Sequence, residues 1–210
     1  MSSTKSIIIS CAGIGSRLGL ATTKALINIK GRTLISYQLE MLKNIEDIRI
    51  VVGFQAHNVI DEVKKYRKDV IFVYNHNYFE TKTGASYFLG AKHGNEYAIN
   101  LDGDLLVHPS DMKKLLEIDG EWIAYSDKMS SDPIFVKTNE LGDVLSFSKK
   151  IGDFEWTGPC CIKKSKLMYS STHVFHQLEP YLPMKGIKIR ACDIDTYDDY
   201  KRAIDFIEKW

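Results

Sequence analysis

Short apolar runs alternate with longer amphipathic segments through the first half of the chain. The runs are rich in β-branched residues, too short to span a membrane, and suited to buried parallel strands. These predicted strands lie at 7–9, 48–52, 70–74 and 97–101. The segments between them place apolar residues on one helical face, and predicted helices lie at about 33–43, 58–66, after Gly84, and at 109–116. Strands that alternate with helices in this way predict an α/β fold with right-handed crossovers and a mostly parallel sheet.

The pattern changes near residue 119, where short strands follow one another with turns between them. Predicted strands lie at 122–126, 133–137, 144–149 and 157–162. A helical region at 166–178, a strand at 187–191 and a last helix at 198–210 complete the prediction. With 210 residues and no repeat or linker, we expect a single domain over residues 1–210.

Composition narrows the class of protein. Apolar residues make up 44% of the chain and charged residues 26%, which is typical of a globular protein. The formal charge of +1 is too small to attract nucleic acid by an overall electrostatic field. The four cysteines, Cys11, Cys160, Cys161 and Cys192, lack C-x-x-C spacing, and no apolar run has the length of a membrane span or a signal peptide. We therefore expect a cytoplasmic protein with reduced cysteines.

A glycine-rich loop follows the first strand, and two cations accompany it. Ala12-Gly-Ile-Gly-Ser16 is followed by Arg17 and Lys24. Free backbone amides beside cations suit a polyphosphate. The loop lacks the G-x-G-x-x-G spacing of dinucleotide sites, because its third glycine is Gly19, and it also lacks the Gly-Lys-Ser/Thr of a Walker loop. The alternative is a glycine turn flanked by two surface cations.

Two acidic clusters are candidates for holding Mg2+. Asp102-Gly-Asp104 comes just after a predicted strand, where open α/β sheets bind ligands. Asp193 and Asp195 flank Ile194 and share a face if this segment is extended. The alternatives are a simple Asp-Gly-Asp turn, and a cap of the last helix built from Thr196 and Asp198.

Three segments, in matching order along the chain, resemble motifs of the nucleotidyltransferases that join a nucleoside triphosphate to a phosphorylated small molecule. They are A-G-x-G-S-R-L-G-x4-K-A-L at 12–26, Asp102-Gly-Asp104, and the closing I-D-T-x-x-D-Y at 194–200. Thr23 stands where that family usually has proline. In length and closing element the chain is similar to phosphocholine cytidylyltransferases and related enzymes of surface-polysaccharide or lipid-precursor synthesis.

The resemblance implies a Rossmann-like three-layer fold, with a nucleotide-binding half at 1–118 and a β-rich acceptor-binding half at 119–210. It implies Mg2+-dependent transfer with release of pyrophosphate, catalysed by Arg17 and Lys24, with Asp104 and Asp195 as metal ligands. The expected nucleotide contacts are Ala12, Gly13, Gly15, Ser16, Gln55, Thr83, Gly84, Ala85, Ser86 and Asp102. Gln55 as an ordinary surface residue is an equal alternative. CTP is the expected donor, with UTP second.

Aromatic and acidic residues of the second half are candidates for the acceptor pocket. They are Trp122, Tyr125, Asp127, Glu155 and Trp156, which together favour a small phosphorylated alcohol, amino alcohol or amino-acid derivative. Trp156 is also a plausible core residue.

The sequence leaves three rival hypotheses open. They are a sugar-1-phosphate nucleotidyltransferase, a glycosyltransferase using Asp102-Gly-Asp104 to bind the metal of a nucleotide-sugar, and a nucleotide-sensing module without turnover. No nucleic-acid partner or membrane span is expected, and an oligomer is compatible with the sequence.

Overall fold

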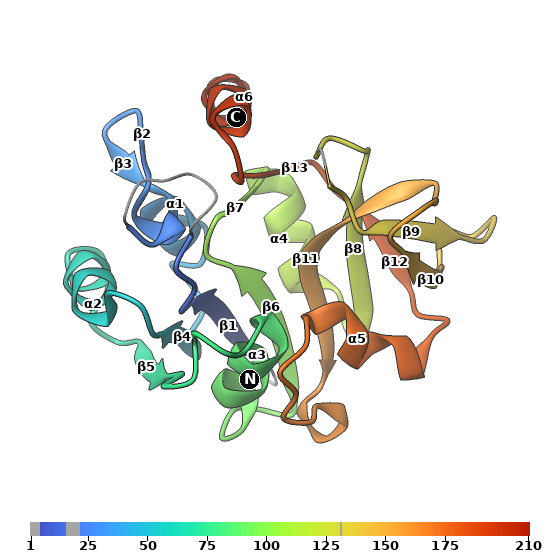
Figure 1. Cartoon of the computed structure of the whole chain (residues 1–210), viewed down its shortest axis with the longest axis horizontal. Coiled ribbons are helices and arrows are strands. Elements are labelled where there is room, and N and C mark those ends of the chain that lie inside the picture. The colour runs from blue at the N-terminus through green and yellow to red at the C-terminus, as the bar shows by residue number, and fades with distance from the viewer. Residues whose placement is uncertain (1–4, 16–21, 131) are drawn as a thin grey trace.

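The chain is built around a mixed β-sheet, whose strands run across the middle of the molecule in Figure 1. The computed structural model describes residues 5–15, 22–130 and 132–210. Within these residues the main sheet has nine strands, in the order β10-β9-β11-β6-β1-β4-β5, with β8 pairing with β11 and β12 pairing with β8. Their bounds are β1 Lys5–Cys11, β4 Ile48–Val52, β5 Ile71–Tyr74, β6 Tyr97–Asp102, β8 Trp122–Ser126, β9 Phe135–Thr138, β10 Val144–Ser148, β11 Phe154–Lys163 and β12 Gly186–Lys188.

The two halves of the sheet differ in strand direction. Strands β6, β1, β4 and β5 run parallel to one another, as the alternation of strands and helices predicts. Strand β11 is long and lies antiparallel to β6, β8 and β9. It therefore continues the parallel part of the sheet directly into the β-rich second half.

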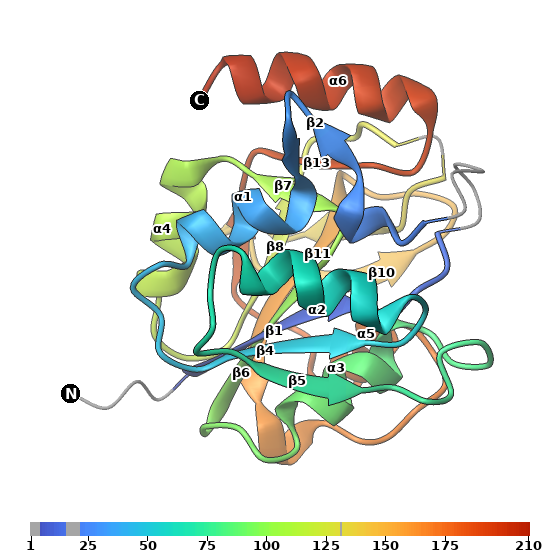
Figure 2. The same cartoon turned by 90° about the vertical axis from the view of Figure 1, so that its left-hand side faces the viewer.

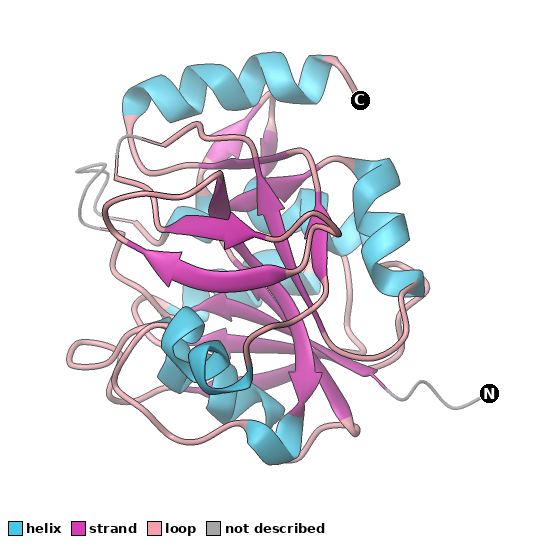
Figure 3. Cartoon of the chain, turned by 90° about the vertical axis from the view of Figure 1, so that its right-hand side faces the viewer, coloured by secondary structure: helices cyan, strands magenta, loops and turns pink. Residues whose placement is uncertain are grey.

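Helices cover both faces of the sheet, which confirms the predicted three-layer α/β fold (Figures 2 and 3). Ile7 and Ile9 point to one face, where they share a core with α1 Leu34–Met41, α2 Ala56–Lys64 and α4 Pro109–Glu117. Ile8 points to the other face, where it shares a core with α3 Thr83–Ala91 and α5 Val174–Leu178. This alternation is the period of two that a strand buried on both sides requires.

A third cluster forms under the last helix. Helix α6, Tyr197–Glu208, lies across one end of the molecule above the β2–β3 hairpin and β13 (Figures 1 and 2). It packs through Ala203 and Ile204 against Leu106 and Ile194. The remaining strands here are β2 Asn28–Ile29, β3 Arg32–Thr33, β7 Leu105–Val107 and β13 Ala191–Asp193.

Some boundaries differ from the predictions. The predicted helix at 166–178 is reduced to α5 and short 3-10 turns at Lys164–Lys166 and Glu179–Tyr181. Ser170 bonds locally to Thr172, and such hydroxyl contacts compete with helix formation. The predicted strand at 187–191 is divided between β12 and β13, and β7 was not predicted. No helix among the described residues combines the length and apolar character needed to cross a bilayer.

Candidate functional site

The segments singled out in the sequence meet at the carboxyl edge of the parallel strands. Ser10 of β1 lies opposite Asp102 of β6, and Cys11 lies opposite Val52 of β4. The glycine loop, the Asp102-Gly-Asp104 turn and the start of α2 therefore leave neighbouring strands at the same end. Ligand sites of open α/β sheets lie at this edge.

The glycine loop leads toward Lys24. Ala12 is buried and its carbonyl accepts a hydrogen bond from Phe54 N (3.1 Å), whereas Gly13 is exposed. Gly15 has φ of +67°, and a Cβ there would lie 3.0 Å from Lys24 Cγ. Only glycine combines that backbone conformation with so close an approach. Two predicted residues of this loop, Ser16 and Arg17, lie outside the described residues.

Lys24 joins the two carboxylates predicted to bind metal. Its Nζ lies 2.7 Å from Asp104 Oδ2 and also forms an ion pair with Asp195 Oδ1. The three side chains are 13%, 20% and 19% exposed. The alternative that made Lys24 a surface cation is wrong, because Lys24 starts the 3-10 helix Lys24–Leu26 and its side chain is mostly buried.

The charges of this cluster shift one another's ionisation. Burial opposes the charged form of Lys24, but the negative charges of Asp104 and Asp193 and the hydrogen bonds to Asp104 and Asp195 raise its pKa. Burial, followed by the charge of Asp104, raises the pKa of Asp102 to about 7. The Oδ1 atom of Asp102 is buried and has no hydrogen-bond partner among the described residues. Burial and the neighbouring negative charge therefore both favour the protonated form of Asp102.

The same carboxylates fit a divalent cation. Asp104 and Asp195 converge on one cation, the Lys24 ammonium group, and carboxylate oxygens are the ligands that Mg2+ prefers. Among the described residues, no group of three or more His, Cys, Asp or Glu side chains is placed to hold a metal. Two carboxylates with water and substrate phosphate oxygens in the other positions is a common arrangement for Mg2+.

The closing element holds Asp195 through a helix cap. Thr196 and Asp199 form a capping box at the start of α6. The Asp199 carboxylate accepts hydrogen bonds from the backbone N–H groups of Asp195 (3.1 Å) and Thr196 (2.7 Å). The capping alternative is therefore correct for Thr196, with Asp199 and not Asp198 as its partner, and this cap itself orients the backbone of Asp195.

The predicted nucleotide contacts form a second group at the same edge. Gln55 is half-buried at the N-cap position of α2, and Thr83 starts α3. Gly84, Ala85 and Ser86 are buried, and Gly84 N donates to Thr172 O (3.0 Å). Of residues 83–86 only Thr83 is partly exposed, so the structure leaves little free surface at 84–86. Their contact with a nucleotide stays a prediction.

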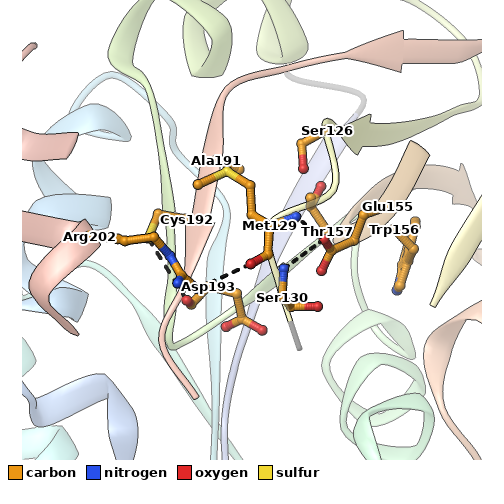
Figure 4. A pocket seen from close by; sticks show the side chains of 10 residues that line it. All are labelled: Ser126, Met129, Ser130, Glu155, Trp156, Thr157, Ala191, Cys192, Asp193 and Arg202. Carbon is orange, nitrogen blue, oxygen red and sulfur yellow. Dashed lines mark hydrogen bonds between the residues drawn. The ribbon is translucent and has the colours of Figure 1, made fainter. Parts of the chain in front are cut away.

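A pocket opens beside Asp193, between β8, β11, β13 and α6 (Figure 4). Glu155 is buried at its wall and accepts hydrogen bonds from Met129 N (2.7 Å) and Ser130 N (3.0 Å). Arg202 donates to Met129 O (3.2 Å) and forms an ion pair with Asp199. The side chains that line the pocket are Ser126, Met129, Ser130, Glu155, Trp156, Thr157, Ala191, Cys192, Asp193 and Arg202.

The predicted acceptor residues divide between this pocket and the core. Glu155 and Trp156 line the pocket, and the Trp156 ring packs edge-on against Phe147 at 5.4 Å. Trp122 is fully buried and Tyr125 is 5% exposed, and neither lines this pocket, so their contact with an acceptor stays a prediction. Both belong to a strand covered on its two faces, a pattern that aromatic residues alone do not reveal. Asp127 is exposed and forms an ion pair with Lys188 (2.7 Å).

Arg202 and Asp199 were not predicted as site residues. The signal for Asp199 is present as the T-x-x-D capping pattern at 196–199. The spacing from Asp199 to Arg202 is that of a helical ion pair. What the sequence does not reveal is that Arg202 also reaches Met129, which is distant in the chain.

Comparisons with known proteins agree with this geometry. Residues 7–153 match the family model of the MobA-like NTP transferase domain. The bifunctional protein GlmU of Aliarcobacter butzleri is 34% identical over 113 residues, which are 52% of this chain and 26% of that protein. The choline-phosphate cytidylyltransferase of Streptococcus pneumoniae is 36% identical over 104 residues, 47% of this chain and 44% of that protein. The chain thus matches about a quarter of the first relative's length and less than half of the second's.

Solved structures share the fold over nearly the whole chain. The inositol-1-phosphate CTP transferase of T. maritima superposes with a TM-score of 0.83 and 19% identity, covering 100% of this chain and 96% of its own. The CTP:phosphocholine cytidylyltransferase LicC of Streptococcus pneumoniae gives 0.77 and 19%, covering 97% and 99%. A putative glucose-1-phosphate thymidylyltransferase from Bacillus anthracis gives 0.81 and 16%, covering 98% and 96%. At these identities the likeness shows the fold.

Proposed function

The chain belongs to the MobA-like NTP transferase domain family, and we propose that it is a nucleotidyltransferase that joins CTP to a small phosphorylated alcohol, amino alcohol or amino-acid derivative. The observation that supports this most strongly is the convergence of Asp104 and Asp195 on the Lys24 ammonium group at the carboxyl edge of the sheet. These residues come from three distant segments, each of which the sequence marks as a motif.

The proposed reaction is an in-line displacement at phosphorus. A phosphate oxygen of the acceptor forms a bond to the α-phosphorus of the nucleotide, the bond from that phosphorus to the bridging oxygen of the β-phosphate breaks, and pyrophosphate leaves. Lys24, and Arg17 from the loop outside the described residues, would neutralise the charge that develops on the phosphates. Neither residue forms a covalent intermediate in this scheme, so the chain contributes by positioning and charge neutralisation.

Mg2+ is the proposed cofactor, held by Asp104 and Asp195. When bound it would neutralise phosphate charge and lower the barrier to attack at phosphorus. Lys24 Nζ lies between the same two carboxylates, at the point where the metal would bind. We therefore expect the lysine side chain to turn toward the nucleotide phosphates when the metal site is filled.

The acceptor is proposed to bind at the pocket beside Asp193, whose volume of about 30 Å³ would have to widen to admit its head group. Its walls combine the carboxylates of Glu155 and Asp193 with the half-buried Trp156 ring. Glu155 already accepts two backbone hydrogen bonds, so Asp193 and Trp156 are the stronger candidates for contact with a polar or cationic head group. The preference for CTP is supported by two structural neighbours, the CTP:phosphocholine cytidylyltransferase and the inositol-1-phosphate CTP transferase.

A hexose-1-phosphate acceptor is the second candidate. The observation that favours it is the fold shared with two sugar-phosphate enzymes. One is the putative glucose-1-phosphate thymidylyltransferase. The other is a UDP-glucose pyrophosphorylase solved with UDP-glucose, which superposes with a TM-score of 0.80 and 16% identity and covers 98% of each chain. UTP would then be the expected nucleotide.

A matrix of substrates tests both candidates. Each of CTP, UTP, ATP and GTP is combined with phosphocholine, inositol-1-phosphate, glycerol-3-phosphate, phosphoserine or glucose-1-phosphate, and pyrophosphate is measured with and without Mg2+. We expect release with CTP and one of the first four acceptors. Preference for glucose-1-phosphate would favour the second candidate, and no Mg2+-dependent release with any pair would contradict the proposed function.

A further inference from the structure

A buried glutamine of α1 reaches the turn that carries Asp104. Gln38 is 1% exposed, and its Nε2 donates to the backbone carbonyls of Asp102 and Leu105, both at 2.7 Å. These carbonyls stand on either side of Gly103-Asp104. The Oε1 atom of Gln38 is buried and accepts no hydrogen bond from any described residue. The two donated bonds therefore set the orientation of the amide.

The turn is held from a second direction by β1. Gly103 N donates to Ser10 O (3.0 Å), and a Cβ on Gly103 would lie 2.8 Å from Cys11 Sγ. The backbone of the turn thus packs closely against β1 and is hydrogen-bonded to α1. With its backbone held on both sides, the Asp104 side chain has few directions available, and it points at Lys24 Nζ.

We propose that Gln38 is a positioning residue for metal binding, which holds Asp104 so that its carboxylate and that of Asp195 face the same point. This inference rests on the proposed function, because it takes the cation at that point to be Mg2+. Gln38 lies more than sixty residues from the turn in sequence and touches it only through backbone carbonyls. Its effect is therefore on the direction of the metal ligand, and residues of this kind typically alter metal affinity or activity by about 10- to 100-fold.

The neighbouring residue provides a matched control. Tyr37 lies on the same helix, is 5% exposed, and donates from its hydroxyl to the backbone carbonyl of Ile29 at 3.0 Å. Tyr37→Phe removes a buried hydrogen bond to a backbone carbonyl without touching the turn. Gln38→Met keeps the length of the side chain and removes both donors. A purely structural role for Gln38 would make the two variants behave alike, apart from the number of bonds lost.

Two measurements distinguish the roles. The first is the Mg2+ concentration that gives half-maximal pyrophosphate release, at saturating substrates. We expect it to rise by at least about tenfold in Gln38→Met and to stay unchanged in Tyr37→Phe. The second is amide hydrogen exchange without metal or substrate. We expect faster exchange for the peptide that contains residues 102–105 in Gln38→Met alone, because the turn has lost one of its two supports.

A folded Gln38→Met protein with wild-type Mg2+ midpoint and wild-type exchange at 102–105 would overturn the inference. Equal changes in Tyr37→Phe would also overturn it. If Gln38→Met does not fold, Gln38→Asn replaces it, since the asparagine side chain is one methylene shorter and its amide reaches at most one of the two carbonyls. A wild-type Mg2+ midpoint and wild-type exchange at 102–105 in Gln38→Asn would likewise overturn the inference. Absence of Mg2+-dependent turnover in the unaltered protein would refute the proposed function, whereas the exchange measurement would still decide whether Gln38 holds the turn.

Discussion

Replacement of Lys24 by alanine removes the ammonium group that lies between Asp104 and Asp195. The two carboxylates are 20% and 19% exposed, so water screens their mutual repulsion only in part. Loss of one partner from such a buried cluster costs about 3 kcal/mol or more. For a chain of 210 residues this corresponds to a fall in Tm of roughly 6–12 °C.

Catalysis should suffer as well, for a separate reason. If Lys24 turns toward the phosphates when Mg2+ is bound, its loss removes charge stabilisation that is greatest in the transition state, which costs about 100- to 1,000-fold in kcat. Added Mg2+ should raise the Tm of Lys24→Ala more than that of the unaltered protein, because a cation then fills the space that the ammonium group occupied between the two carboxylates.

The assay combines thermal unfolding in EDTA and in Mg2+ with steady-state pyrophosphate release. Lys30→Ala is the control, because Lys30 pairs with Glu208 at the surface of the adjacent β2–β3 hairpin, with a side chain that is 44% exposed. That variant should change neither Tm nor turnover appreciably. A Lys24→Ala protein that melts lower but keeps normal turnover would refute the reasoning and make Lys24 a structural residue.

Three further predictions follow from the site and the core. Asp104→Asn and Asp195→Asn should each lower turnover by orders of magnitude and weaken the Mg2+ dependence of turnover, while each protein still unfolds cooperatively. Near-normal rates with an unchanged Mg2+ requirement would exclude the altered residue from the metal site. Trp156→Ala should raise the KM of the acceptor by about 5- to 30-fold, as loss of roughly 1–2 kcal/mol of cation–π contact implies, and leave the KM of CTP nearly unchanged; equal changes in both would place Trp156 in the core. Trp122→Ala should lower the free energy of unfolding by about 3–5 kcal/mol, measured by urea denaturation, since the side chain is fully buried; a small loss would contradict its core role.

The parallel half of the fold could be predicted because its signals are local. Buried strands such as Ile48–Val52 are short and consist mainly of β-branched residues, which is a local signal even though Arg49 interrupts the apolar run. Strand β8, Trp122–Ser126, was also predicted correctly, but the elements that pack against its two faces could not be predicted. Whether Trp122 faces a pocket or the core depends on which elements cover both faces of that strand, and this is decided by packing across the chain.

The site was predictable where one residue type has one plausible role, and not where backbone groups are involved. Lys24, Asp104 and Asp195 carry charges at motif positions, and the structure brings them together. Gln38 left no sequence signal, because its partners are carbonyls that every residue possesses. Arg202 likewise contacts a backbone carbonyl, that of Met129.

The most direct test of the proposed chemistry is phosphorus-31 NMR of the products formed from CTP, Mg2+ and the accepted phosphorylated compound. Transfer of the cytidylyl group predicts equal amounts of pyrophosphate and of a diphosphate diester, whose two coupled phosphorus signals show that the α-phosphate of CTP is joined to the acceptor's phosphate. Formation of CDP, or release of free CMP without the diester, would contradict the proposed nucleotidyl transfer.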